Sequence, residues 1–446
     1  MRSSACSKTR RCASRSGRAV LKLSALITTG RYWLRSTCIF WRMSAVDRET
    51  LALRNRAMAE AFHTPPLKHR IRHAALSILA QLPTLPAARQ TTERILIIRP
   101  DHLGDVLLTT PAIRALRQAR PRAEIHALVG GWAADVLANN PDVDQVLTLA
   151  FPGFTRTPKE NWRTPYWFAL RTARQLRMIG YSAAVILRPD HWWGALVCKL
   201  AGIRRRIGYD LPDVGHFLND RVPFVHQHAV RQNALLIERL TGSIMDPQLR
   251  LSFSVSAEDS AWVQGYLSEH GVSSDEKLLC IHPGSGTWVK RWGEDHWAQV
   301  ADTLADQLDA RVIFTGGDHE LELVHEIRRR MKHDAISLAG DTRVGTLAAL
   351  FQRAALVLGP DSGPLHLAAA VDTPTVTLFG PADPTEFGTW GDPEQHPILF
   401  SNMGCRPCRI LDWGTDAPEN HPCVRDIPVG RVLEAARRAY QAANPG

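Results

Sequence analysis

The stretch Arg94-Ile-Leu-Ile-Ile-Arg-Pro-Asp-His-Leu-Gly-Asp105 opens the regular part of the chain. Its four consecutive apolar residues, 95–98, are typical of a strand that is buried on both faces of a parallel sheet. A loop over residues 99–104 follows, and the spacing beyond it predicts a helix that continues through Ala119. A strand, a loop and a helix in this order indicate an α/β fold.

The alternation of strand and helix continues to residue 187 and begins again near residue 277. In the first series we expect strands at 124–129, 145–149 and 183–187, with a helix at 166–179. In the second we expect strands at 278–281, 311–314, 356–358 and 375–378, with helices at 296–308 and 321–331. Strands separated by helices imply parallel sheets, so the sequence predicts two parallel-sheet domains.

The pattern divides the 446 residues into four parts. Residues 1–90 form a basic leader and an amphipathic helix, 91–250 and 251–428 the two Rossmann-like domains, and 429–446 a C-terminal helix. Ten of the 54 lysines and arginines, and no acid, lie before residue 44, so the rest of the chain is balanced at 44 residues of each sign. The net charge of +10 therefore does not predict a nucleic-acid partner.

The leader has three interpretations: a disordered arm, an organelle transit peptide, or translated sequence upstream of a start at Met43. Neither a secretory signal nor a run of about 18 apolar residues is present in the sequence, so we expect a cytoplasmic protein with reduced thiols. Apolar residues recur at helical spacing over 67–82, and the basic stretch Lys68–Arg72 lies in the first turns of this predicted helix. This helix either lies on an anionic membrane surface or packs on its own domain.

The loop after the first strand carries the candidate base. Gly104 permits a close backbone approach, and Asp105 follows it at the start of the predicted helix. A helix N-cap is the structural alternative for Asp105, and Asp101 is the alternative acid–base residue.

Three further motifs follow strands of the second series. His282-Pro-Gly-Ser-Gly-Thr287, with Lys290, has the small residues and the cation that suit an anion, but it lacks the third glycine of a dinucleotide fingerprint. Gly359-Pro-Asp-Ser-Gly-Pro-Leu-His366 predicts a helix N-terminus that would hold a pyrophosphate, with His366 on its first turn. Glu320, after Gly316-Gly317, would bind a ribose or base edge, or else would be a helix-start acid.

In this combination and order, the motifs resemble glycosyltransferase family 9, the heptosyltransferases of lipopolysaccharide core assembly. The resemblance covers residues 94–440, and its most specific pieces are the segment around Leu103-Gly-Asp-Val106, the run Asp361–His366, and Phe379-Gly-Pro-Ala-Asp-Pro384. It implies a GT-B fold, in which an acceptor domain and a nucleotide-sugar domain face each other across a cleft. It also implies that the C-terminal helix, residues 429–446, returns toward the first domain. The two positions at which this chain departs from the family, Asp101-His102 and Arg188–Trp193, both lie on the acceptor side.

The resemblance also implies roles for residues. Asp105 would be the general base, and the donor would be held by Ser285, Thr287, Lys290, Glu320, Asp361, Ser362, Gly363 and His366. On the acceptor side the candidates are Arg99, Asp101, Gly104 and Arg188. The expected reaction is an inverting, metal-independent transfer of a sugar, heptose from ADP-heptose, to a lipid-linked glycan acceptor, with no cofactor. Peripheral contact with the inner face of the membrane would bring the enzyme to its acceptor.

Two alternatives stay open at this point: a transferase of another nucleotide sugar for a different surface glycan, and a non-catalytic nucleotide-binding protein on the same scaffold. Cys405, Cys408, His421 and Cys423 also offer four ligands for zinc, although their spacing is irregular for such a site. Whether these cysteines bind zinc is left open.

Overall fold

The computed structural model describes residues 48–63, 67–81, 83, 92–154, 163–244 and 248–444, except the side chains of residues 67–72. The leader up to Met43 lies outside the described residues. Pro247, near the predicted boundary between the two domains, also lies outside them. The described strands form two six-stranded sheets, and every strand pair in both is parallel. The α/β class and the two parallel sheets are therefore confirmed.

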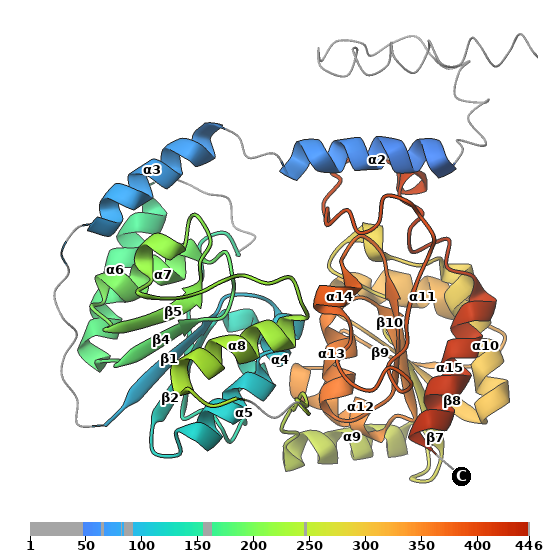
Figure 1. Ribbon diagram of the computed structural model, residues 1–446. Helices are drawn as coiled ribbons and strands as arrows, with labels where there is room; N and C mark the ends of the chain where they lie inside the picture. Colours follow the sequence, from blue (N-terminus) through green and yellow to red (C-terminus); the bar gives the residue numbers. More distant parts are fainter. Residues whose placement is uncertain are drawn as a thin grey trace, which may run out of the picture. The chain divides into compact units, whose positions relative to one another are not determined.

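The first sheet has the strand order β3-β2-β1-β4-β5-β6. Its strands are β1 (Arg94–Arg99), β2 (Glu124–Val129), β3 (Gln145–Thr148), β4 (Ala183–Ile186), β5 (Arg205–Tyr209) and β6 (Asp220–Val222). Alternate residues of β1 point to opposite faces, so Leu96 and Ile98 are buried among one set of helices and Ile95 and Ile97 among another. Helices α6 (Thr164–Ile179) and α7 (Trp192–Leu200) cover the first face, and α5 (Thr110–Ala119) and α8 (Ala229–Thr241) cover the second (Figure 1).

The helix predicted to run unbroken to Ala119 is in fact two helices, α4 (Leu103–Leu107) and α5. Pro111 lies in the first turn of α5, where its missing N–H is tolerated, but it could not continue the ladder of a longer helix. The hydroxyls of Thr109 and Thr110 donate to the carbonyls of Val106 and Leu107 and so satisfy the end of α4. The break keeps α4 short at the carboxyl end of β1.

The second sheet repeats the order of the first, as β9-β8-β7-β10-β11-β12. Its strands are β7 (Lys277–Ile281), β8 (Ala310–Gly316), β9 (Ile336–Ala339), β10 (Leu356–Pro360), β11 (Thr375–Phe379) and β12 (Ile398–Phe400). Its helices and 3-10 turns are α9 (Ala257–Glu269), η5 (Trp288–Lys290), α10 (Glu294–Leu308), η6 (Asp318–Glu320), α11 (Leu321–Arg330), α12 (Val344–Arg353), α13 (Gly363–Ala370) and α14 (Pro384–Phe387).

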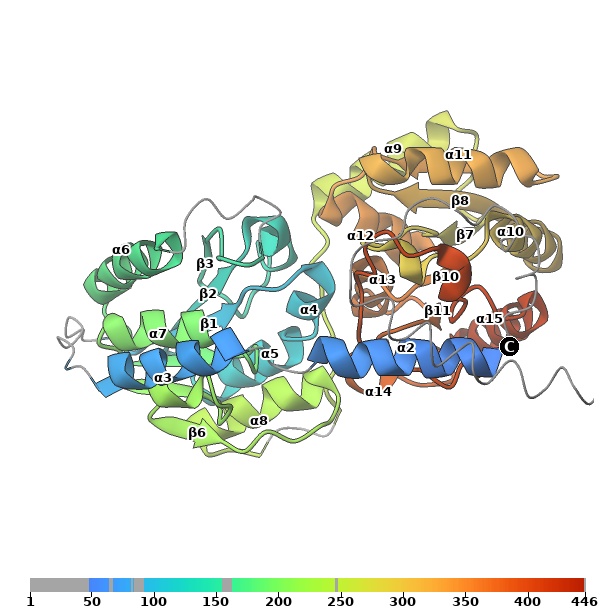
Figure 2. The ribbon, with the colours of Figure 1, turned by 90° about the horizontal axis from the view of Figure 1, so that it is seen from above.

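The C-terminal helix α15 (Val429–Ala443) begins at the predicted residue. It packs against α10 and against strands β10 and β11, so it lies on the second sheet (Figure 2). These contacts differ from the return toward the first domain that we expected. Buried Val432, Ala435, Ala436 and Ala439 form its contact face, and their spacing gives one apolar stripe that the second sheet covers.

Two helices precede the first strand. Helix α2 (Arg48–His63), which the sequence analysis did not predict, contacts the loop that follows β12: Arg54 forms an ion pair with Asp416 at 2.7 Å, and buried Asn55 donates to the carbonyl of Asn420. Helix α3 (Leu67–Gln81) was predicted.

The contacts of α3 are with the first-sheet half of the chain. Leu76 is buried in the first sheet's core, and His73 bonds to Asp213 at 3.2 Å. Helix α3 therefore packs on its own domain, which is one of the two interpretations given above. Among the described helices, none is long and apolar enough to cross a bilayer.

Candidate active site

Both sheets reverse strand order beside their first strand, and in such sheets ligands bind beyond the carboxyl ends of the strands at this point. In the first sheet the point lies between β1 and β4, and in the second between β7 and β10. The motifs that contain Asp105, Arg188, Lys290 and Asp361 follow these four strands, whereas Glu320 follows β8. The topology therefore brings Arg99 beside Arg188, and Lys290 beside Asp361.

A network of ion pairs fills the first of these points. Arg99 is buried and contacts Asp101 at 2.7 Å and Asp105 at 3.1 Å. Arg188 pairs with Asp101 from the other side and with Asp190 at 2.5 Å. Although burial alone would raise the pKa of Asp101, the two arginines outweigh it and lower that pKa. Asp101 is thus a buried, doubly paired carboxylate that orients both arginines.

Asp105 differs from Asp101 in its surroundings. It lies within α4, whose N-cap is His102, and its side chain accepts a hydrogen bond from Arg99, so the N-cap alternative for Asp105 is wrong. About a third of its side chain, 32%, is exposed. Burial and the negative charge of Asp101 raise the pKa of Asp105 against the opposing effect of Arg99 and Arg188. A carboxylate with a raised pKa and an open face can accept a proton from a bound hydroxyl.

Asp105 lines a cavity of about 270 Å³. The remaining walls come from both halves of the chain: Arg99, Asp101, Arg188, Pro189, Asp190, Leu211, Phe224, His226, Ala229, Gln232, Glu386, Phe387 and Arg409. The predicted acceptor-side residues Arg99, Asp101 and Arg188 are all in this lining. Glu386, Phe387 and Arg409 were not predicted as site residues. A weak signal was present for Glu386, which comes two residues after the Phe379–Pro384 motif.

The second reversal point holds the Lys290 ammonium. Its Nζ lies 2.6 Å from Oδ2 of Asp361 and 3.2 Å from the carbonyl of the same residue. Lys290 belongs to η5, and Asp361 follows β10 directly. An ammonium has three N–H donors, so one remains for another acceptor.

The start of α13 has buried polar atoms without partners. Ser362 is its N-cap residue, Gly363 begins it and Pro364 lies in its first turn, as the sequence predicted. The Oγ of Ser362 and the Nδ1 of His366 are buried and have no hydrogen-bond partner among the described residues. Burial lowers the pKa of His366 to about 4, so its ring is neutral at pH 7. Two free polar atoms beside a helix N-terminus suit an anion.

The two reversal points meet through glycines. A Cβ added to Gly104 would lie 2.8 Å from the ring of His366 and 3.1 Å from the Cα of Gly363. Only glycine at position 104 allows α4 to approach α13 this closely. A second contact lies nearby, where His228, the N-cap of α8, bonds to the carbonyl of Gly388 at 2.8 Å.

Three predicted donor residues form hydrogen bonds within their own loops. The hydroxyl of Ser285 donates to the carbonyl of Thr287, and the side chain of Thr287 accepts from the amide of Val289. Glu320 is buried and accepts from the amide of Gly317 at 2.8 Å, the geometry of the helix-start alternative. Their roles as donor ligands stay predictions.

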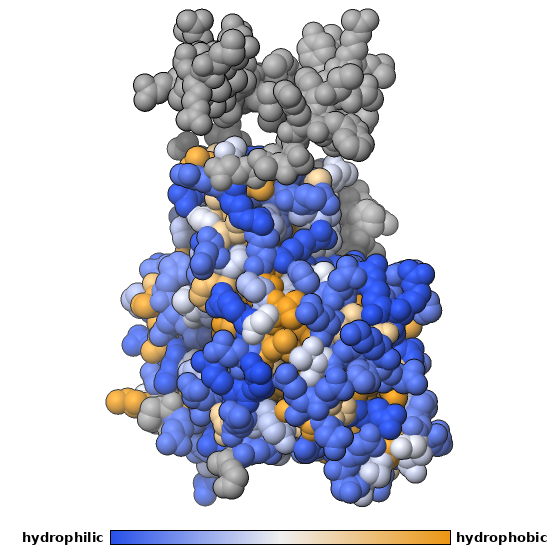
Figure 3. Space-filling view, turned by 90° about the vertical axis from the view of Figure 1, so that its right-hand side faces the viewer, coloured by the Kyte–Doolittle hydropathy of each residue, from blue (hydrophilic) through white to orange (hydrophobic). Residues whose placement is uncertain are grey.

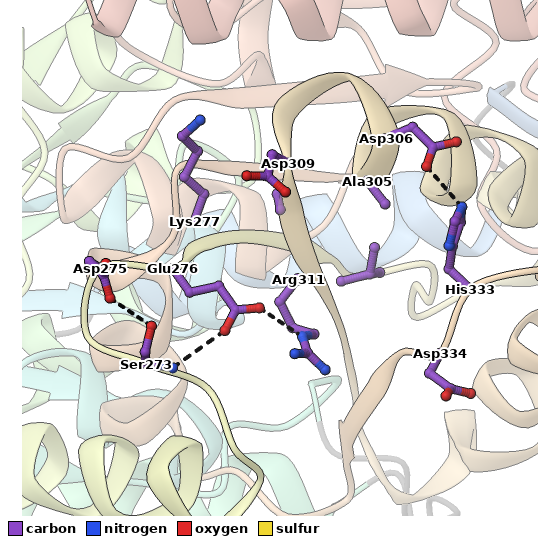
Figure 4. Close-up of a pocket in the computed structure, with 12 residues that line it drawn as sticks. Ser273, Asp275, Glu276, Lys277, Ala305, Asp306, Asp309, Arg311, His333 and Asp334 are labelled. Atoms are coloured by element: carbon purple, nitrogen blue, oxygen red, sulfur yellow. Dashed lines mark hydrogen bonds and ion pairs between the residues drawn. The ribbon is translucent and has the colours of Figure 1, made fainter.

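A larger cavity, of about 710 Å³, lies elsewhere (Figure 4). Lys277 and Ala310 in its wall begin strands β7 and β8, so it lies at the amino ends of these strands of the second sheet. Two ion pairs lie in its wall, Arg311 with Glu276 and His333 with Asp306. This cavity is larger than the one beside Asp105, but the predicted site residues all lie at the opposite strand ends.

Within the part of the chain that the structure describes, no three His, Cys, Asp or Glu side chains are grouped so that they could hold a metal ion. Cys405, Cys408 and Cys423 are free thiols, and burial raises the pKa of Cys423 to about 12. His421 instead bonds to Asp416 at 2.8 Å.

The model of glycosyltransferase family 9 (heptosyltransferase) matches residues 169–411, more than half of the chain. The chain belongs to glycosyltransferase family 9. It is therefore a glycosyltransferase of the heptosyltransferase family, as the motifs indicated. Lipopolysaccharide heptosyltransferase 3 of Escherichia coli K12 is 29% identical over 296 residues, which cover 64% of this chain and 82% of that protein. Lipopolysaccharide heptosyltransferase 2 of the same strain is 26% identical over 354 residues, 76% of this chain and 97% of that protein.

Solved structures of this family share the fold. The glycosyl transferase family 9 structure from Veillonella parvula DSM 2008 has a TM-score of 0.66 at 23% identity and covers 80% of this chain and 99% of that one. The E. coli ADP-heptose lipopolysaccharide heptosyltransferase II has a TM-score of 0.62 at 22% identity, with 78% and 99% covered. The E. coli heptosyltransferase WaaC, solved with ADP-2-deoxy-2-fluoro heptose, has a TM-score of 0.55 at 24% identity, with 70% and 94% covered. The fold of this chain is therefore GT-B.

Proposed function

We propose that this enzyme transfers heptose from ADP-heptose to a hydroxyl of a lipopolysaccharide-core acceptor, with inversion at the anomeric carbon and without a metal ion. The observation that carries the proposal is the position of Asp105, which lines a cavity while its neighbour Gly104 contacts the start of α13. Because the base and the anion-binding helix end lie this close, one can activate the attacking hydroxyl while the other stabilises the departing diphosphate in the same displacement.

Asp105 would act as the general base. A sugar hydroxyl is a poor nucleophile, and a positioned carboxylate that takes its proton contributes a factor of about 10² to 10⁴ in rate. The raised pKa of Asp105 makes it a better proton acceptor than an ordinary aspartate. Asp101 is unsuited to the role because two arginines hold its buried carboxylate in the ionised form. One base and one direct displacement give inversion.

The diphosphate would lie at the start of α13. Negative charge grows on the departing nucleoside diphosphate, and the helix N-terminus, the free donor of Lys290 and the hydroxyl of Ser362 can stabilise it. Asp361 would keep the ammonium of Lys290 in place, and neutral His366 would donate a hydrogen bond from its ring. These groups supply positive electrostatic potential from the protein itself, which supports a metal-independent reaction.

The donor assignment rests on the family and on the solved relatives, of which WaaC was solved with an ADP-linked fluoroheptose. The test is a turnover series with ADP-heptose, ADP-glucose, GDP-mannose and UDP-glucose, each with the same lipopolysaccharide-core acceptor and with and without EDTA. We expect product with ADP-heptose, unchanged by the chelator. Turnover with another nucleotide sugar in its place would reject this donor, and binding without any turnover would favour a non-catalytic nucleotide-binding protein.

We also propose peripheral contact with an anionic membrane, made by helices α2 and α3. Leu53 and Phe62 on α2 are 59% and 66% exposed, and Ile78 on α3 is 68% exposed. Between Glu60 and Glu93 the sequence has no acidic residue. Exposed apolar side chains together with basic residues suit a bilayer with anionic lipids. The face of the second-sheet half seen in Figure 3 is, by contrast, mostly hydrophilic.

Co-sedimentation with vesicles tests this contact. We expect binding to vesicles that contain phosphatidylglycerol, weaker binding to pure phosphatidylcholine, and loss of binding in the double variant Phe62→Glu, Ile78→Glu. The matched control is Trp262→Glu, which changes an exposed apolar residue on α9. Equal binding by the double variant and the wild type would reject these helices as the contact.

A further inference from the structure

The cavity beside Asp105 has a wall that the proposed reaction does not use. Glu386 and Phe387 of α14, and Arg409 from the loop after β12, line it opposite the first-sheet residues. The groups suited to the diphosphate, Lys290 and Ser362, are not part of this lining. The cavity therefore lies on the acceptor side of Asp105, and its second-sheet wall faces whatever carries the attacking hydroxyl.

Arg409 is held firmly in this wall. Its Nη2 lies 2.8 Å from Asp383 and 3.1 Å from Glu386, and its backbone amide donates to the carbonyl of Pro381. Its φ of 61° is in the left-handed region, which is unfavourable for a residue with a side chain. Strained backbone persists where surrounding contacts fix it, and such positions cluster at ligand sites.

Asp383, in the Phe379–Pro384 motif, holds the residues of this wall in place. Its carboxylate accepts from the amide and the hydroxyl of Thr385 and so caps α14, while it also bonds to Arg409. One aspartate thus fixes both the helix that carries Glu386 and the guanidinium of Arg409. The carboxylate of Glu386 is buried, and its Oε2 has an ion pair but no well-aligned hydrogen bond among the described residues. It can accept hydrogen bonds from a ligand.

Carboxylates outnumber arginines in the cavity lining, four to three. Each arginine of the lining is already paired: Arg99 with Asp101 and Asp105, Arg188 with Asp101 and Asp190, and Arg409 with Asp383 and Glu386. An acidic or phosphorylated sugar would have to displace one of these carboxylates or lie beside it, at an electrostatic cost. Hydroxyl groups, which donate to carboxylates and accept from guanidinium groups, fit this lining without such a cost.

We propose that the cavity binds the accepting sugar as an uncharged, polyhydroxyl unit, and that Glu386 and Arg409 contact its hydroxyl groups. The phenyl ring of Phe387 offers an apolar surface for the C–H face of the sugar beside these polar groups. This inference rests on the proposed function, since it takes Asp105 as the base. It makes Glu386 and Arg409 specificity residues for the acceptor rather than for the donor.

The test compares two oligosaccharide acceptors that differ only in the terminal sugar, which is a neutral heptose in one and carries a carboxylate in the other. Isothermal titration calorimetry measures the binding of each to the full chain saturated with ADP. We expect the wild type to bind the neutral acceptor at least about tenfold more tightly. Glu386→Gln should weaken binding of the neutral acceptor by about tenfold, which is the effect of one hydrogen bond to a charged group. The ratio of the two acceptor affinities should therefore be smaller in this variant than in the wild type.

Glu394→Gln, an exposed acid in the same part of the chain, is the matched control and should leave both affinities unchanged. Arg409→Lys is a second variant that keeps the charge but loses the planar fork, and it should also weaken binding of the neutral acceptor. Tighter wild-type binding of the acidic acceptor would overturn the inference. So would variants that lower ADP affinity and leave acceptor affinity unchanged. Turnover of ADP-heptose is a separate readout, so a failure of the donor assignment would leave this binding result standing.

Discussion

The two strand-reversal points have the same topology, but they differ in how far their charged and polar side chains are paired. Between β1 and β4, Arg99 and Arg188 are paired with carboxylates, and Asp105 combines an open face with a raised pKa. Between β7 and β10, one ion pair of Lys290 lies beside a helix end where Ser362 Oγ and His366 Nδ1 have no hydrogen-bond partner among the described residues. The topology therefore fixes where a ligand binds, while the pairing of charges at each point sets what kind of group it accepts.

The largest expected effect comes from removing the open carboxylate. Asp105→Ala should lower kcat by at least about a hundredfold, because the variant lacks the carboxylate proposed to take the proton from the acceptor hydroxyl. ADP binding, which depends on the second point, should stay within about twofold of the wild type by calorimetry. Wild-type turnover in this variant would reject Asp105 as the base at the first reversal point. Asp101→Asn would then be the next variant to measure.

Next in size is the cation of the second point. Lys290→Ala should weaken ADP binding and lower kcat/KM, each by roughly tenfold to a hundredfold, since a hydrogen bond to a charged group is lost. Lys277→Ala is the control, because Lys277 lies at the opposite end of the same sheet. If acceptor affinity fell instead of ADP affinity, Lys290 would belong functionally with the first point.

The glycine contact between the points should give a smaller effect. Gly104→Ala would press a methyl group against His366 and Gly363, and overpacking of this kind costs about 1–3 kcal/mol. Thermal unfolding and kcat/KM should both decline. Gly131→Ala is matched to it, since nothing lies within 4 Å of the added Cβ there. Equal behaviour of the two variants would show that the points do not need this close approach.

The smallest effect concerns pH. Because the folded-state pKa of Asp105 is raised above its usual 3.8, kcat/KM should fall as pH drops through that raised value. By the same linkage, the folded state is less stable once pH rises above it, when Asp105 is ionised. Asp105→Asn should therefore unfold at an equal or slightly higher temperature than the wild type at pH 7. A lower unfolding temperature would mean that the ionised carboxylate stabilises the first point.

Much of the fold could be predicted from the sequence because buried parallel strands are continuous apolar runs, as in Ile95–Ile98. Of the missed strands, β6, β9 and β12 lie at sheet edges and have only three or four residues, while β5 is an interior strand that begins with Arg205 and Arg206. The break between α4 and α5 was missed although Pro111 signals it. Helix α2 lacks a clear apolar stripe and owes its place to contacts with a loop more than 300 residues away in the sequence.

The site was predictable wherever its residues directly follow a strand, as Asp105, Lys290 and the start of α13 do. Local sequence did not predict Arg409, because it reaches the cavity from the long loop after β12, or Glu386, because its place depends on α14, which Asp383 caps, and on its ion pair with Arg409. It also could not rank Asp101 against Asp105 on physical grounds, since that ranking depends on Arg188, which is 87 residues from Asp101 in the sequence.

The attachment of α2 has a practical consequence for anyone who designs a shortened version of this enzyme. A chain that starts just before β1 would retain both sheets and every predicted catalytic group, and it could still pass as a properly folded transferase by spectroscopy. It would, however, leave the Asp416–Asn420 segment without its covering helix, and that segment belongs to the same long loop as Arg409. Trimming the amino terminus would thus alter acceptor choice before it altered donor use.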